Sequence, residues 1–184
     1  MLTSWLKSLF ANKTKPQLAL EWIWADSFKK LLEPRIELLN QAIDVSQLHS
    51  KYKSLTREQQ LVVWGEFFKW LSYYESGWDP KSASVDVGSK FDRNTWSIGL
   101  LQMSVVDQKN LGLYLDYDFD SLLMPLPNLT LGLAVMVNQI QKRKKIFIPK
   151  SEKGNPSVYW ATLNPGNQYD KSDLILAKTK AIAF

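Results

Sequence analysis

The chain of 184 residues is 45% hydrophobic and 22% charged, a size and composition typical of a single globular domain. It contains no cysteine, which excludes disulfides, thiol nucleophiles, zinc–thiolate sites and iron–sulfur clusters. Its single histidine, His49, excludes a multi-histidine metal site, and we expect it to be a structural or surface residue. We expect no metal and no cofactor. The net charge of +5 favours an anionic partner, such as a nucleic acid, a membrane surface or a cell-wall polymer.

Residues 1–50 are predicted to form a helical extension packed on the main domain, residues 51–184. Residues 1–15 place apolar side chains at helical spacing, which indicates an amphipathic helix packed on the body, with membrane contact as the less favoured alternative. No basic residue precedes this apolar part and no apolar run is long enough to span a membrane, so we expect neither a signal peptide nor a transmembrane helix. Two further helices are predicted over Gln17 to Lys30 and Pro34 to Val45.

A buried central helix is predicted within the stretch from Thr56 to Pro80. Thr56 and Gln59 have the spacing of a capping box, and Gly77 followed by Asp79-Pro80 predicts the end of the helix. Its apolar positions are too dense to form one stripe, which is typical of a helix buried on nearly all sides. These positions are Leu61, Val62, Val63, Trp64, Phe67, Phe68, Trp70, Leu71, Tyr73 and Tyr74.

Glu75 occupies the last turn of this predicted helix, behind two tyrosines and close to Trp78. Burial among aromatic rings and the negative end of the helix dipole both penalise a carboxylate, so both should raise the pKa of Glu75. A carboxyl group that keeps its proton near neutral pH is suited to act as a general acid. The alternative is a solvated glutamate at a frayed helix end.

After Pro80 the pattern becomes irregular. Residues 81–94 are predicted to form a polar loop, which has room for a small β-hairpin around Ser84–Gly88. Helices are predicted within Trp96 to Gln108, from an N-cap at Asn128 to about Ile146, from Ser157 to Leu163, and from Ser172 to Ala181.

Four short motifs follow one another along the chain. They are Glu75-Ser76, Gly99-Leu100-Leu101-Gln102, Asn128 to Gly132, and Leu163-Asn164-Pro165-Gly166. In order and spacing they resemble the lysozyme-like superfamily, specifically the soluble lytic transglycosylases and the goose-type lysozymes. The resemblance spans about Thr56 to Gly166. The resemblance implies a mainly α, lysozyme-like α+β fold. It also implies that the protein cleaves peptidoglycan.

The resemblance also implies roles for individual residues. Glu75 resembles the general acid that protonates the glycosidic oxygen, and Ser76 the serine beside it. Gly99, Leu100 and Gln102 resemble the motif that borders the sugar before the cleaved bond, although plain core packing is the alternative for this segment. Asn164 resembles the asparagine of the last motif. Aromatic side chains are predicted to wall the glycan cleft, among them Trp78, Trp96, Tyr114 and Tyr117.

The last motif departs from the family pattern. The tyrosine that contacts the glutamate in the family falls at Leu163, and the alanine falls at Pro165. Tyr159, Trp160 and Tyr169 are the candidates to fill the space.

A second carboxylate would decide the reaction type. Inverting hydrolysis needs a base beside the acid, whereas lytic transglycosylases resemble one-carboxylate enzymes in which the C6 hydroxyl of the sugar closes a 1,6-anhydro product. Asp92 lies near the place where goose-type lysozymes keep a water-positioning aspartate, and Asp86 is a further candidate on the same loop. The position of their other aspartate looks like Ser104. Asp92 as an ordinary surface residue is the alternative, and both reactions stay open.

We therefore expect a monomeric bacterial glycosidase that cuts the β-1,4 bond between N-acetylmuramic acid and N-acetylglucosamine, with glycan strands as partner and no nucleic acid. This substrate implies the periplasm, the cell envelope or the exterior. A non-catalytic peptidoglycan-binding domain of the same fold is the first alternative. A basic helical protein that binds membranes or nucleic acid is the second.

Overall fold

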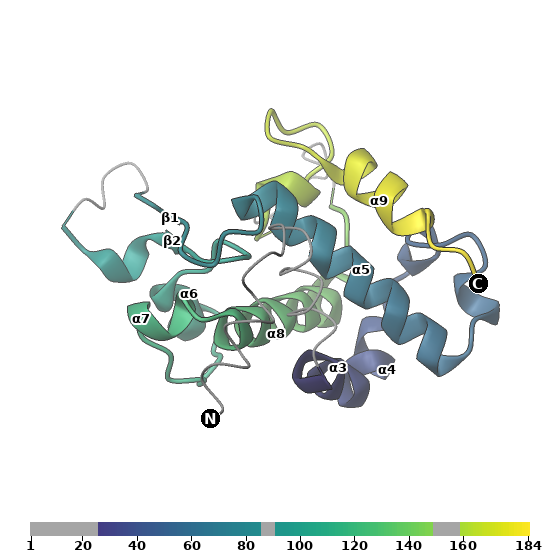
Figure 1. Cartoon of the computed structure of the whole chain (residues 1–184), viewed down its shortest axis with the longest axis horizontal. Helices are drawn as coiled ribbons and strands as arrows, with labels where there is room; N and C mark the ends of the chain where they lie inside the picture. Colours follow the sequence, from purple (N-terminus) through teal and green to yellow (C-terminus); the bar gives the residue numbers. More distant parts are fainter. Residues whose placement is uncertain (1–25, 86–90, 149–158) are drawn as a thin grey trace, which may run out of the picture.

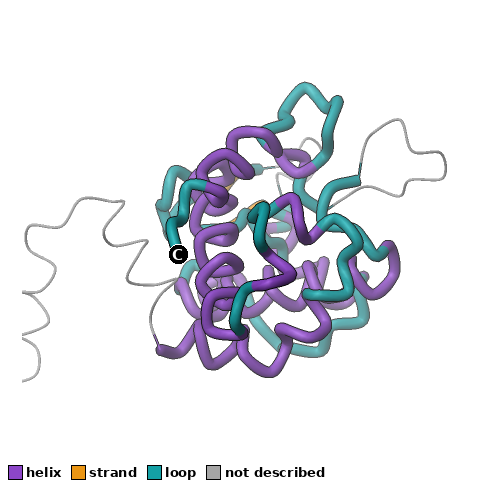
Figure 2. The backbone as a smooth tube through the Cα atoms, turned by 90° about the vertical axis from the view of Figure 1, so that its right-hand side faces the viewer, coloured by secondary structure: helices purple, strands orange, loops and turns teal. Residues whose placement is uncertain are grey.

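The computed structural model describes residues 26–85, 91–148 and 159–184. Helices make up most of this structure, and strand is confined to one small antiparallel sheet (Figure 2), which confirms the predicted mainly helical fold class. The α-helices are α3 (Asp26–Leu32), α4 (Ile36–Leu39), α5 (Arg57–Ser76), α6 (Val105–Asn110), α7 (Phe119–Leu122), α8 (Pro125–Arg143) and α9 (Ser172–Lys180). The 3-10 helices are η1 (Glu33–Arg35), η2 (Val45–Gln47), η3 (Tyr52–Ser54), η4 (Arg93–Thr95) and η5 (Ala161–Leu163). None of the helices in the described ranges is long and apolar enough to cross a membrane.

The helix α5 crosses the middle of the molecule, with α9 on one side and α3, α4 and α8 on the other (Figure 1). Its side chains Trp64, Phe67 and Phe68 are completely buried, and the rings of Phe67 and Phe68 meet edge to face with centroids 5.5 Å apart. Burial of such large apolar side chains stabilises the fold by roughly 2–3 kcal/mol each. The prediction of a buried central helix is therefore confirmed.

Both ends of α5 follow the local signals in the sequence. The Thr56 hydroxyl accepts from the Gln59 backbone N–H, and the Gln59 side chain accepts from the Thr56 N–H, so the predicted capping box is present. At the other end Gly77 adopts a left-handed conformation with φ of 61°, and its N–H donates to the carbonyl of Tyr73 at 2.8 Å. This conformation favours glycine and ends the helix directly after Glu75 and Ser76.

The helices α3 and α4 belong to the same hydrophobic core as α5 and α8. Phe28 of α3 meets Phe68 of α5 edge to face, with ring centroids 5.6 Å apart. The break predicted at Pro34 is present, because the 3-10 helix η1 separates the two α-helices there. The helix predicted from Gln17 is described only from Asp26 onward, and the amphipathic segment 1–15 lies outside the described residues.

The sheet of the described residues pairs the start of the polar loop with residues that follow the loop. Strand β1 (Ala83–Ser84) pairs antiparallel with β2 (Ser97–Ile98), so Ala83 lies opposite Ile98. The hairpin was expected around Ser84–Gly88, of which 86–88 lie outside the described residues. The observed pairing holds the segment that follows β2 close to the end of α5.

The helix α8 begins three residues before the predicted N-cap. Pro125 occupies its first turn, where the missing N–H and fixed φ of proline are favourable, and Met124 is the N-cap. Asn128 therefore does not cap the helix, and the prediction that it does is wrong. Its buried side chain instead bonds to backbone groups outside the helix.

Candidate active site

Glu75 extends from the last turn of α5 toward the segment that carries η5. The Thr162 hydroxyl donates to Glu75 Oε1 at 2.5 Å. Burial raises the pKa of Glu75 from 4.5 to about 7, and the hydrogen bond from Thr162 opposes this shift because it stabilises the carboxylate. Glu75 therefore keeps its proton to a higher pH than an ordinary glutamate does.

The aromatic residues near Glu75 in the sequence pack elsewhere. The Trp78 ring lies against Tyr73, with centroids 4.5 Å apart, and against Trp70 at 5.5 Å. The Trp78 indole N–H donates to the carbonyl of Lys69 at 2.9 Å. No ring of this cluster is among the described residues that line the cavity around Glu75. The predicted direction of the pKa shift of Glu75 thus agrees with the structure. Trp78, which was predicted to wall the cleft, is not among the described residues of the cavity wall.

Ser76 connects the end of α5 to the second motif. Its hydroxyl lies 3.0 Å from the carbonyl oxygen of Ser72 on the same helix and 3.0 Å from that of Leu100. Leu100 itself is buried in the core, as the packing alternative for this segment expected. Ser76 thus fixes the distance between the glutamate and the Gly99–Gln102 segment.

Gly99 and Asn128 hold this second motif in place. Gly99 has φ of 72°, and a Cβ atom there would collide with the Asn128 side chain and the carbonyl oxygen of Leu122. Asn128 donates to the carbonyl oxygens of Ile98 at 2.8 Å and Leu122 at 2.9 Å. It also accepts from the Leu101 N–H at 2.8 Å. Position 99 thus requires glycine for two reasons: its backbone is left-handed, and there is no space for a Cβ atom.

Gln102 lies in the wall of the cavity that also contains Glu75. Its backbone is left-handed, with φ of 50°, and its amide nitrogen donates to the carbonyl of Gly99 at 2.9 Å. Its amide oxygen accepts from the Ser84 hydroxyl at 2.9 Å. Among the described residues each end of the amide has one hydrogen-bond partner, and an amide can form a second bond at each end.

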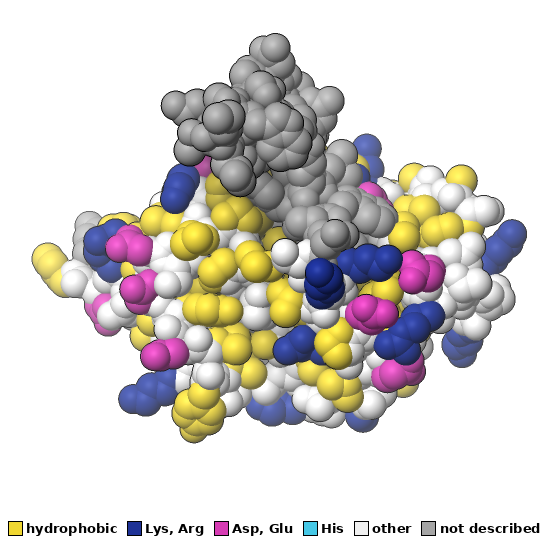
Figure 3. All heavy atoms as spheres, turned by 60° about the horizontal axis from the view of Figure 1, so that its bottom comes forward, with side chains coloured by type: hydrophobic (Ala, Val, Ile, Leu, Met, Phe, Trp, Pro, Cys, Tyr) yellow, Lys and Arg dark blue, Asp and Glu magenta, His cyan; other side chains and the backbone are white. Residues whose placement is uncertain are grey.

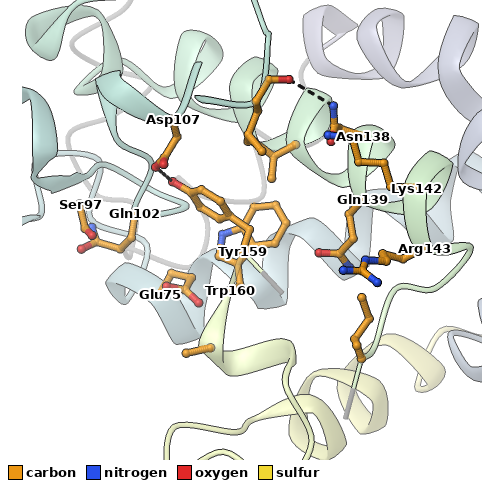
Figure 4. A pocket seen from close by; sticks show the side chains of 14 residues that line it. Glu75, Ser97, Gln102, Asp107, Asn138, Gln139, Lys142, Arg143, Tyr159 and Trp160 are labelled. Atoms are coloured by element: carbon orange, nitrogen blue, oxygen red, sulfur yellow. Dashed lines mark hydrogen bonds between the residues drawn. The ribbon is translucent and has the colours of Figure 1, made fainter. Parts of the chain in front are cut away.

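The cavity has a volume of about 600 Å³, within the usual range for ligand sites. Figure 4 shows Glu75 and Gln102 at one side, Tyr159 and Trp160 in the middle, and the polar side chains of α8 at the other side. The lining residues are Glu75, Ser97, Gln102, Asp107, Leu111, Val135, Asn138, Gln139, Lys142, Arg143, Ile148, Tyr159, Trp160 and Ala161.

Residues 159–161 contribute to this wall, and Thr162, Leu163 and Asn164 follow directly after them. Trp160 is buried, and its indole N–H donates to the carbonyl of Leu101 at 2.9 Å. The Tyr159 hydroxyl donates to Asp107 Oδ2 at 2.6 Å. Leu163 is fully buried in the core, so the place of the family tyrosine faces away from the cavity. Asn164 is buried too, and no donor among the described residues reaches its Oδ1.

Of the predicted site residues, only Glu75 and Gln102 are among the described lining residues of this cavity. Ser76, Gly99, Leu100 and Asn164 are not among them, and neither are the three residues that follow. Asp92 is exposed, and its carboxylate accepts from the Asn94 N–H at 2.9 Å as the N-cap of η4. Tyr114 is 94% exposed. Tyr117 is half-buried, and its backbone is held by the Gln108 amide at 2.7 and 3.0 Å. None of the three is among the described lining residues, and Asp86 lies outside the described residues.

Sequence reasoning missed Thr162 and Asp107. Thr162 adjoins Leu163, so the motif indicated the neighbourhood but not the residue. Asp107 lies three residues past Ser104. The short helix α6 brings it back to the cavity that contains Glu75.

No family model and no curated protein matches the chain. Among solved structures it is similar to "Bd0314 DslA wild-type form 2", with a TM-score of 0.72 and 21% identity over 88% of this chain and 89% of that chain. This chain has the DslA fold. A mutant form of DslA, with a glutamate replaced by glutamine, gives a TM-score of 0.67 and 19% identity over 84% of this chain and 88% of that chain. At these identities the likeness concerns the fold alone.

Proposed function

We propose that this chain is a glycosidase that cleaves the β-1,4 bond between N-acetylmuramic acid and N-acetylglucosamine in peptidoglycan. One observation carries the proposal. The carboxyl group of Glu75 is half-buried, has a pKa raised to about 7, and lines a cavity of about 600 Å³. A protonated carboxyl group in a ligand-sized cavity is what acid-catalysed cleavage of a glycosidic bond requires.

In this mechanism Glu75 donates its proton to the glycosidic oxygen as the bond to the anomeric carbon breaks. The Thr162 hydroxyl holds Oε1 of the carboxyl group at 2.5 Å and stabilises the carboxylate that remains. Because the pKa lies close to neutral pH, the proton is present before the step and leaves without a large cost.

The other walls suit a polysaccharide. Amide side chains at Gln102, Asn138 and Gln139 can bond hydroxyl and N-acetyl groups, and the ring of Tyr159 offers a flat apolar surface. Lys142 and Arg143 line the cavity too, which is consistent with an anionic wall polymer. On the face shown in Figure 3, lysines and arginines intermingle with acidic side chains rather than forming one basic surface. This pattern does not favour nucleic acid as the partner.

Digestion of purified peptidoglycan sacculi tests the proposal, with soluble muropeptides measured by mass spectrometry. The parent protein should release muropeptides, and Glu75→Gln should reduce the release by about 100-fold or more because the amide has no acidic proton. Glu58→Gln is the matched control, since Glu58 is an exposed residue near the start of the same helix. Full activity of the Glu75→Gln protein would refute the assignment.

The same experiment addresses a non-catalytic binding domain, the alternative raised by the missing motif tyrosine. If the protein were such a domain, the parent protein would pellet with the sacculi and would release no muropeptides from them. Release that depends on Glu75 excludes this alternative.

A further inference from the structure

The cavity contains a second carboxylate, Asp107 in the helix α6. Besides Glu75, it is the one acidic side chain among the described residues of the cavity wall. In the view of Figure 4 Asp107, Gln102 and Glu75 all lie to one side of the Tyr159 ring, whose hydroxyl points to Asp107. The site therefore has acidic groups at two places around one space.

Hydrogen bonds fix the orientation of Asp107. The Tyr159 hydroxyl donates to Asp107 Oδ2 at 2.6 Å and accepts from the Ser104 N–H at 3.2 Å. The Tyr159 ring is itself held edge to face against Trp160, with centroids 5.1 Å apart. Tyr159 therefore bonds to one oxygen of the Asp107 carboxylate, Oδ2, and the other oxygen is Oδ1.

Tyr159 serves as a permanent donor to this carboxylate. Burial raises the pKa of Tyr159, and the charge of Asp107 raises it further. The charge of Glu75 has a smaller effect in the same direction. Its hydroxyl group therefore stays protonated at physiological pH, and its position within the field of both carboxylates agrees with the arrangement in Figure 4.

Asp92 does not occupy an equivalent position. Its carboxylate bonds to the Asn94 backbone in an exposed turn, and it is not one of the described residues of the cavity wall. Asp107 is thus better placed than Asp92 to act on a molecule bound beside Glu75.

We propose that Asp107 is the general base of an inverting hydrolysis at this site, with Tyr159 as its positioning residue. The inference rests on the proposed function and deepens it by choosing between the two reactions that the sequence left open. Inverting glycosidases place their two carboxyl groups roughly 6.5–9.5 Å apart, which leaves room for the attacking water.

The step is balanced in atoms and charge. Asp107 takes one proton from a water molecule, and the oxygen of that water forms a bond to the anomeric carbon. The bond from this carbon to the leaving oxygen breaks, and the leaving oxygen takes the proton of Glu75. The product has a reducing end in the α configuration, and the two carboxyl groups exchange a proton with solvent to reset.

The first measurement is product analysis of sacculi digested by the full-length protein in H₂¹⁸O. Hydrolysis puts one ¹⁸O atom at each new reducing end, and proton NMR at early times should show the α-anomer. Anhydro products without the label, or β-anomers, would overturn the assignment of Asp107. They would leave the role of Glu75 as acid intact, so the two proposals fail separately.

The second measurement compares variants. Asp107→Asn should lower kcat about 100-fold or more while KM stays within a few-fold, and added azide should restore turnover by forming an α-glycosyl azide. Azide attacks the anomeric carbon in place of water and needs no base, so rescue reports a lost base rather than a lost fold. Asp173→Asn, an exposed aspartate on α9, is the control. An Asp107→Asn protein with near-parental kcat, or with a loss that azide does not restore, would contradict the proposal.

Tyr159→Phe tests the positioning role. It removes the hydroxyl that holds Asp107 and keeps the ring that packs on Trp160. We expect a roughly 10-fold lower kcat, an unchanged KM and products that still have labelled reducing ends. Loss of binding with unchanged kcat would show that Tyr159 acts on the substrate alone.

Discussion

The hydroxyl of Thr162 and the carboxyl group of Glu75 are joined at 2.5 Å although 87 positions separate them in the chain. Burial makes the charged form of Glu75 unfavourable, and Thr162 partly compensates by donating to it. The pKa of about 7 is the balance between these two effects, and each can be altered by mutation.

Thr162→Val should move the activity of the protein to higher pH. Valine keeps the shape of threonine but cannot donate, so the carboxylate loses a stabilising partner and the pKa of Glu75 rises. The alkaline limb of the kcat/KM profile on solubilised glycan should shift upward by about one pH unit, since a hydrogen bond to a charged group contributes about 1.5 kcal/mol or more.

Thr162→Ser is the control for this shift, because serine retains the hydroxyl. Its alkaline limb should stay near that of the parent. A downward shift in Thr162→Val would mean that the hydroxyl stabilises the protonated acid, contrary to the direction assigned here.

Glu75→Gln should make the protein more stable at pH 8 than the parent. In the pH range from 4.5 to about 7 the folded parent binds more protons than the unfolded chain, so its stability falls as pH rises. Above this range the full penalty is present, at most about 3 kcal/mol for a shift of this size. Glutamine carries no charge and can still accept from Thr162, so it avoids this penalty.

Urea unfolding at pH 4 and pH 8 measures this difference. The two proteins should be almost equally stable at pH 4 and differ most at pH 8. A variant that is less stable than the parent at pH 8 would show that the ionised carboxylate is favoured in the folded state.

Gly99→Ala should destabilise the fold by about 3 kcal/mol or more. The left-handed backbone costs an alanine about 1 kcal/mol, and its Cβ would displace Asn128 and the carbonyl of Leu122. Gly112→Ala separates the two costs, because Gly112 has φ of 68° and no atom lies within 4 Å of the added Cβ. Equal losses for the two variants in thermal unfolding would contradict the proposed collision.

Asp44→Ala should lower the free energy of unfolding by about 2–3 kcal/mol. The Asp44 carboxylate accepts from the N–H groups of Ile146 at 2.9 Å and Phe147 at 3.0 Å, both of which are buried residues. Alanine leaves two donors without this acceptor. Asp44→Asn retains one oxygen acceptor and should lose about half as much in urea unfolding, whereas equal losses would point to charge rather than hydrogen bonding.

Local signals in the sequence were sufficient to predict the central helix. The capping box at Thr56, the stop at Gly77 and the dense apolar pattern between them depend on neighbouring residues only. The prediction of an N-cap at Asn128 was wrong because this residue makes contacts that are distant in the sequence. Its polar side chain satisfies three backbone groups from residues 98, 101 and 122, which no local pattern records.

The candidate site was predicted in part. Glu75 and Gln102 do line one cavity, as expected from the order of the motifs, and Ser76 and Gly99 hold its edge. Thr162 and Asp107 could not be identified, because their positions depend on how η5 and α6 pack against α5. The roles predicted for Asp92, Tyr114, Tyr117 and Asn164 stay predictions.

The late position of residues 159–163 has a consequence for biosynthesis. A ribosome has completed α5 and the Gly99–Gln102 segment long before it adds Tyr159 and Thr162. Until then Glu75 lacks both its hydroxyl donor and the part of its enclosure that this segment supplies. The wall of the candidate site is consequently complete only when synthesis of the described residues is nearly finished.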